Sequence, residues 1–118
     1  HGPTVHFFNE YSFTVSRKIA DRLEALYERF GNPTNRSSGA PWSQFYVIRM
    51  ATDCPTLLIE CGFLDNATDR ELLIRSDFQE AFCQSTVDGI VDYYRSTALY
   101  TTRTTSTGNA VSTTAATT

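Results

Sequence analysis

Apolar residues recur every three or four positions between residues 12 and 30, the spacing of a helix with one buried face. Ser12 is a candidate N-cap, and Gly31 is a stop signal because a proline follows two positions later. The pattern predicts an amphipathic helix from Ser12 to Phe30. Its apolar stripe consists of Val15, Ile19, Leu23, Leu26 and Phe30.

Three short segments rich in β-branched and aromatic residues predict strands. These are Thr4–Asn9, Phe45–Met50 and Thr56–Cys61. The third is a continuous apolar run, which is typical of a central strand buried on both faces. A Gly-, Pro- and Ser-containing stretch over residues 31–42 predicts a loop.

Two further helices are predicted after the third strand. The first covers Asp69–Arg75, with Asn66 or Thr68 as its cap, and the second covers Asp77–Tyr94. Gly89 lies inside the second helix, where glycine costs about 1 kcal/mol relative to alanine. We therefore expect Gly89 to mark a close packing contact.

Alternating strands and helices predict an α/β fold, a three-layer sandwich with helices packed on a twisted, mainly parallel sheet. Three strands make a small sheet, so we expect a partial domain, over residues 1–96, whose N-terminal strands are missing. The composition then shifts to Thr, Ser, Ala and Gly. Residues 97–118 are expected to form a Thr/Ser-rich disordered linker or tail.

The charge distribution argues against two classes of partner. The net charge is −3, and the ten basic residues are scattered rather than clustered, so we expect neither nucleic acid nor membrane as a partner. No apolar run approaches the roughly 20 residues of a membrane span. The three cysteines, Cys54, Cys61 and Cys83, show no metal-site spacing and are expected to be buried or partly buried thiols.

The segment P-T-L-L-I-E-C-G-F-L-D-N, residues 55–66, carries the most chemistry. It places Glu60 near the carboxyl end of an apolar strand, where α/β folds commonly hold active sites. A carboxylate there can act as a general base on a metal-bound water. Alternatively, Glu60 caps the following turn or pairs with an arginine such as Arg36 or Arg49. Physical reasoning leaves both interpretations open.

This segment is similar to the pattern P-A-x-L-V-E-x-G-F-x-S-N of the type 3 N-acetylmuramoyl-L-alanine amidases, with Asp65 where serine is usual. The matching residues are Pro55, Leu58, Glu60, Gly62, Phe63 and Asn66. The upstream F-Y-V-I-R resembles the family's l-y-V-L-R, and the resemblance extends over about residues 2–94.

The resemblance implies a zinc-dependent α/β enzyme that hydrolyses the amide between N-acetylmuramic acid and L-alanine of peptidoglycan. Glu60 then corresponds to the general base and acid. Arg36 corresponds to a loop arginine, which either contacts substrate or is a solvated loop residue. The family's zinc ligands, two His and one Glu, have no counterpart here, and neither His1 nor His6 lies in a ligand motif. Zinc is therefore expected only in a full-length parent, with no metal ligand in this chain.

The resemblance also implies a secreted protein of the cell wall, an autolysin or endolysin. We expect a monomer, and the composition of the Thr/Ser-rich tail suggests a tether to a cell-wall-binding module. The alternative is a non-catalytic relative of the same fold that binds cell-wall material or a protein partner. An upstream sequence with the family's His, Glu and S-x-H-x-N segments would indicate the enzyme.

Overall fold

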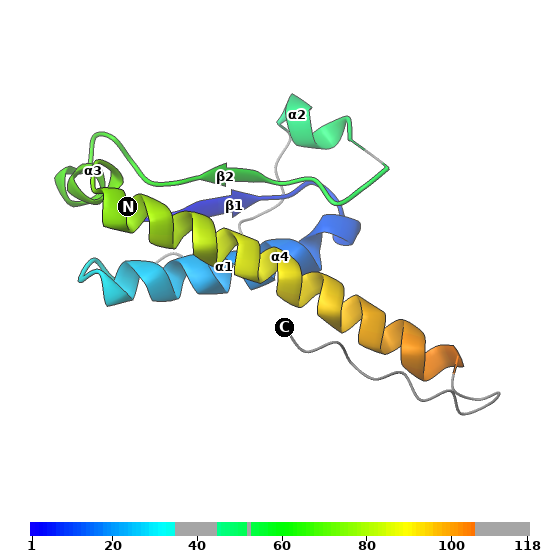
Figure 1. Cartoon of the computed structure of the whole chain (residues 1–118). Coiled ribbons are helices and arrows are strands. Elements are labelled where there is room, and N and C mark those ends of the chain that lie inside the picture. The colour runs from blue at the N-terminus through cyan, green and yellow to red at the C-terminus, as the bar shows by residue number, and fades with distance from the viewer. Residues whose placement is uncertain (35–44, 52, 106–118) are drawn as a thin grey trace.

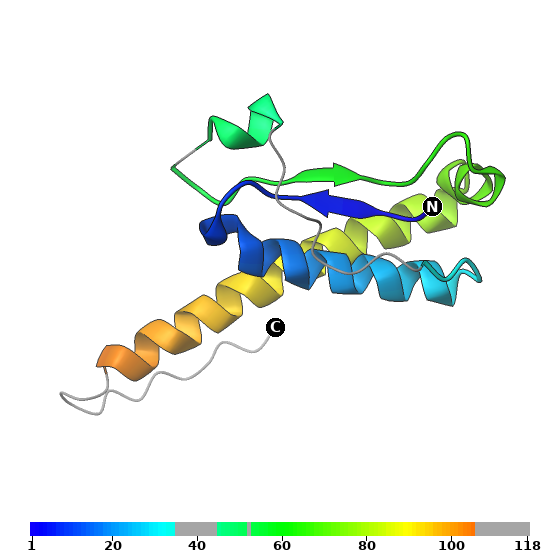
Figure 2. The same cartoon turned by 180° about the vertical axis from the view of Figure 1, so that it is seen from behind.

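The computed structural model describes residues 1–34, 45–51 and 53–105. Figure 1 shows α1 and α4 side by side on one side of the two strands, with α2 on the other side, and Figure 2 shows the same arrangement from behind. In chain order the elements are β1 Thr4–His6, α1 Glu10–Arg29, α2 Tyr46–Arg49, β2 Leu58–Glu60, α3 Ala67–Leu73 and α4 Ser76–Thr105.

Helix α1 begins one turn earlier than predicted. Asn9 is its N-cap, and the Asn9 side-chain oxygen accepts a hydrogen bond from the Ser12 backbone N–H at 3.0 Å. Ser12, the predicted cap, instead uses its hydroxyl to accept from the Thr56 N–H at 3.0 Å, which ties α1 to the segment before β2. The predicted end is confirmed: Phe30 is the C-cap, and Gly31 follows with a φ of 79°.

The hydrophobic core lies mainly between α1 and α4. Gly89 is a point of close approach between the two helices, because a Cβ at this position would lie 2.8 Å from Ile19 Cγ1 and 3.0 Å from Ile19 Cα. The predicted packing contact at Gly89 is thus confirmed. The buried core residues are Val5, Val15, Ile19, Ala20, Leu23, Leu26, Tyr27, Leu72, Phe78 and Phe82.

The two strands pair antiparallel, with the register Thr4↔Glu60, Val5↔Ile59 and His6↔Leu58. Side chains alternate between the faces of a strand. Val5 and Ile59 therefore face the α1/α4 core, and the other two pairs face away from it.

The α/β class holds, but the described strand pair is antiparallel, whereas a mainly parallel sheet was predicted. Periodicity and composition identify a strand without recording its direction, and the long connection from β1 to β2 permits either orientation. The prediction that the third segment is buried on both faces is also wrong for the described part. Leu58 and Ile59 are only partly buried, and Glu60 is exposed.

The predicted strand Phe45–Met50 is wrong, because this segment forms the single-turn helix α2. The Arg49 and Met50 N–H groups donate to the carbonyls of Phe45 and Tyr46, at 3.0 and 3.1 Å. Only Ile48 is buried. Aromatic and β-branched residues favour strands only where a neighbouring strand and a buried face are present, and α2 has one buried side chain and no strand partner.

Asn66 caps α3, as predicted, by accepting from the Asp69 N–H at 3.0 Å. Helix α4 continues beyond its predicted end at Tyr94 to Thr105, so residues 97–105 extend the helix. The domain boundary after residue 96 stays a prediction, and residues 106–118 lie outside the described ranges. Within those ranges, no helix is long and apolar enough to cross a membrane.

The side chain of Asp69 joins four segments of the chain. It is fully buried, with 0% of its surface exposed. Its Oδ2 accepts from the Gly2 N–H at 2.7 Å and the Phe63 N–H at 3.0 Å, and its Oδ1 accepts from Asn32 Nδ2 at 2.9 Å. A buried carboxylate is costly unless such donors satisfy it. Asp69 thus fixes the start of β1, the end of α1 and the turn after β2 around the N-terminus of α3.

We expect Gly89→Ala to lower the free energy of unfolding by up to about 2 kcal/mol, because an overpacking cost of about 1–3 kcal/mol is only partly offset by a helix-propensity gain of about 1 kcal/mol. Urea unfolding followed by circular dichroism measures the change. Ser96→Ala, at an exposed position of the same helix, is the control and should be near neutral. A stabilised Gly89→Ala variant would contradict the close contact.

We expect Asp69→Ala to lower the free energy of unfolding by about 3 kcal/mol or more, because three buried donors lose their acceptor at about 1–3 kcal/mol each. Asp69→Asn is the matched control. Its amide oxygen can still accept from Gly2 and Phe63, so its loss should be smaller. Equal losses of unfolding free energy for the two variants in urea would show that the acceptor oxygens of Asp69 do not account for its stabilising effect.

Candidate functional site

Glu60 is the last residue of β2 and lies on the strand face that points away from α1 and α4. Its side chain is 45% exposed, so the carboxylate reaches solvent, as a proton acceptor must. Thr4 lies directly opposite on β1 and is buried, and its hydroxyl has no hydrogen-bond partner among the described residues. The predicted position of Glu60, at the carboxyl end of a strand, is confirmed.

His6 of β1 contacts Glu60 directly, with 3.1 Å between His6 Nε2 and Glu60 Oε2. Sequence reasoning missed this partner and suggested Arg36 or Arg49 instead. Arg36 lies outside the described residues, and Arg49 is exposed on α2. The strand register that brings His6 and Glu60 together is not readable from either strand alone. The available signal was that both residues interrupt apolar strands with a polar side chain.

The turn after Glu60 is held against α1 by Tyr27. The Tyr27 hydroxyl donates to the Cys61 carbonyl at 2.6 Å. Gly62 permits this contact, because a Cβ there would lie 2.6 Å from the same hydroxyl oxygen. Burial, with the nearby charges of Asp69 and Cys61 adding, raises the pKa of Tyr27 far above its ordinary value. The phenol therefore stays protonated and remains a donor, which fixes the backbone directly after Glu60.

Cys54, Cys61 and Cys83 are exposed residues, so the prediction of buried or partly buried thiols is wrong for Cys54 and Cys83, and only the sulfur of Cys61 is partly buried. The reason is position, since each lies at a strand end, in a connecting segment or on the outer side of α4. Partial burial of its sulfur, with Cys83 adding, raises the pKa of the Cys61 thiol. A protonated thiol is a weak nucleophile, which argues against Cys61 as a nucleophile.

The residues of this chain do not fit a metal site. No group of three or more His, Cys, Asp or Glu side chains comes together in the described part. Residues 35–44, 52 and 106–118 contain none of these four residue types. Each histidine has a different partner: His1 Nε2 lies 3.0 Å from the Pro33 carbonyl oxygen, and His6 lies against Glu60.

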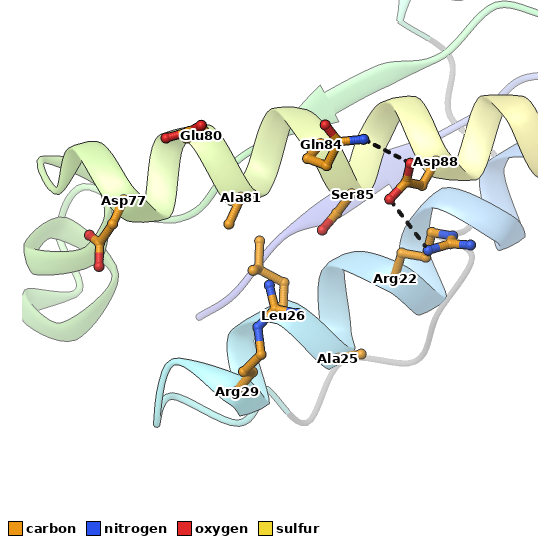
Figure 3. Close-up of a pocket in the computed structure, with 10 residues that line it drawn as sticks. All are labelled: Arg22, Ala25, Leu26, Arg29, Asp77, Glu80, Ala81, Gln84, Ser85 and Asp88. Atoms are coloured by element: carbon orange, nitrogen blue, oxygen red, sulfur yellow. Dashed lines mark hydrogen bonds and ion pairs between the residues drawn. The ribbon is translucent and has the colours of Figure 1, made fainter. Parts of the chain in front are cut away.

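A second candidate site is a pocket between α1 and α4 (Figure 3). Its lining comes from these two helices alone and is rich in charged side chains. Asp88 accepts from Gln84 Nε2 at 2.8 Å and lies 3.8 Å from Arg22 Nη1. Neither strand contributes to this pocket, so its lining includes neither Glu60 nor His6.

A family model described as N-acetylmuramoyl-L-alanine amidase matches residues 1–92. N-acetylmuramoyl-L-alanine amidase LytC of Bacillus subtilis is 27% identical over 95 residues, which are 80% of this chain and 18% of LytC. The probable cell wall amidase LytH of Staphylococcus epidermidis is 29% identical over 96 residues, which are 81% of this chain and 31% of LytH.

The fold is similar to that of the CwlD amidase from Clostridioides difficile, solved in complex with the GerS lipoprotein. The TM-score is 0.68 at 26% identity, with 80% of this chain and 46% of the CwlD chain covered. The chain spans less than half the length of each of these three relatives. Since the family model matches well over half of its residues, the chain belongs to the N-acetylmuramoyl-L-alanine amidase family.

Proposed function

We propose that a protein containing this chain cleaves the amide between N-acetylmuramic acid and L-alanine of peptidoglycan, with Glu60 as general base and then general acid. The observation that carries this proposal is the position of Glu60. Its carboxylate is exposed at the end of β2, beside the polar residues His6 and Thr4, on the strand face that points away from α1 and α4.

The proposed reaction needs one group that first takes a proton and then returns it. Glu60 accepts a proton from a water molecule, whose oxygen attacks the lactyl carbonyl carbon. The same carboxyl then donates the proton to the amide nitrogen as the C–N bond breaks. The products are a lactyl carboxylate and the free amine of L-alanine. A positioned acid–base group contributes typically 10²–10⁴-fold to such a rate.

The zinc that the family resemblance implies is not assigned to residues of this chain. When bound, zinc polarises a carbonyl and lowers the pKa of a bound water. The histidines and carboxylates here do not gather into a ligand set, so we propose that the ligands lie outside these 118 residues.

We propose peptidoglycan in the cell wall, outside the cell, as the place of action. Support comes from the family match and from the name of LytH, a probable cell wall amidase. The substrate contact of Arg36, a monomeric state and a tethered cell-wall-binding module stay predictions. CwlD was solved in complex with the GerS lipoprotein, and binding of a protein partner by this chain is a further prediction.

Glu60→Gln should reduce peptidoglycan hydrolysis by about 10²-fold or more, because the amide keeps the shape of the side chain but cannot take the proton. The measurement uses a protein in which these residues complete an amidase domain, and it follows the release of L-alanine amino groups.

Glu71→Gln is the matched control for this measurement. Glu71 is an exposed glutamate on α3, and its removal changes the net charge equally. It should leave the rate unchanged. Undiminished turnover by Glu60→Gln would reject Glu60 as the general base.

Calorimetric titration of the 118-residue chain with zinc should show no tight one-to-one site, because its histidines and carboxylates are dispersed. The same titration of a His1→Ala and His6→Ala double variant should give the same trace. A sub-micromolar site that disappears in the double variant would show that this chain does supply zinc ligands.

A further inference from the structure

The contact between His6 and Glu60 follows from the strand pairing. His6 lies directly opposite Leu58, and Glu60 is two residues further along the same face of β2. Diagonal neighbours of this kind lie within reach of long side chains. The 3.1 Å approach between His6 Nε2 and Glu60 Oε2 therefore rests on the backbone register.

His6 is the more constrained partner of the two. Its side chain is 15% exposed, against 45% for Glu60. The edge of one ring meets the face of the other in the contact between His6 and Phe45, with 5.1 Å between ring centroids and an interplanar angle of 81°. Because Phe45 and strand β1 hold the His6 ring, His6 orients the more exposed carboxylate of Glu60, and Glu60 does not orient His6.

His6 is the donor in this hydrogen bond, and Glu60 is the acceptor. An ionised carboxylate has no hydrogen to donate, so His6 Nε2 must carry it. Among the described residues, His6 is the only side chain that donates to Glu60, and it contacts Oε2 alone. Arg49 of the nearby helix α2 is exposed and forms no ion pair with Glu60. The second oxygen, Oε1, is left without a protein donor in this part of the chain.

We propose that His6 is a positioning residue for Glu60: its Nε2–H holds Oε2, so that Oε1 is the oxygen that takes the proton from water. This inference rests on the proposed function of Glu60. Without His6 the exposed carboxylate samples several rotamers, and misplacement of a reacting group costs rate rather than binding.

The hydrogen bond can be tested on the 118-residue chain itself by NMR of the two histidine rings. The His6 Nε2–H should exchange slowly enough to be observed, and it should be lost or shifted in Glu60→Ala. The His1 ring, which contacts Pro33 instead, serves as the internal control and should not change. Unchanged His6 signals in Glu60→Ala would overturn the inference.

The role in rate is tested with the complete amidase domain. His6→Phe keeps a ring against Phe45 but removes the donor, and we expect kcat to fall about 10- to 100-fold with little change in KM. His6→Gln restores a donor, because its side-chain amide can reach Oε2, and it should recover much of the rate. Both variants should unfold at the same urea concentration as the unsubstituted protein.

The outcomes separate the two proposals. Wild-type kcat in His6→Phe, or equal losses in His6→Phe and His6→Gln, would reject the positioning role. An unsubstituted protein that hydrolyses no peptidoglycan would instead reject the proposed function. A rate loss in His6→Phe that His6→Gln reverses, together with the NMR result, would support both.

Discussion

The buried carboxylate of Asp69 is the interaction on which the rest of this structure depends. Two of its three donors are backbone N–H groups, at Gly2 and Phe63, so Asp69 fixes main chain rather than side chains. These donors lie just before β1 and just after β2. A carboxylate at one end of the strand pair therefore holds both strands in position. Glu60 lies three residues before Phe63, whose N–H is fixed by Asp69.

The two faces of the strand pair serve different purposes. On one face, Val5 and Ile59 complete the α1/α4 core, which supplies apolar burial. On the other face, Thr4, His6 and Glu60 are polar, Leu58 is apolar, and Glu60 remains exposed. Alternation along a strand makes this division possible within three residues. Neighbouring residues such as Ile59 and Glu60 therefore lie on opposite faces, one packed on the core and the other exposed.

Sequence reasoning found what local patterns encode. Helix α1, the third strand segment, the Asn66 cap and the close contact at Gly89 all follow from periodicity, capping chemistry or composition. The antiparallel register does not, because it depends on two segments 54 residues apart. His6 was missed for that reason.

Asp69 was missed for a related reason. Within its own helix it looks like an ordinary acidic residue in a first turn, and its donors come from distant segments. The error at α2 has the opposite origin, since a strand-like composition does not show that this segment has no hydrogen-bonded strand partner among the described residues.

The length of α4 has a geometric consequence for the chain that follows. Its packing against α1 ends near Tyr93, the last α4 residue that packs on the core, yet the helix continues to Thr105. At 1.5 Å per residue, the residues after Tyr93 extend the axis by about 18 Å. Figure 1 shows this part of α4 running out beyond the ends of both strands. The helix therefore sets the direction in which the chain leaves the folded core.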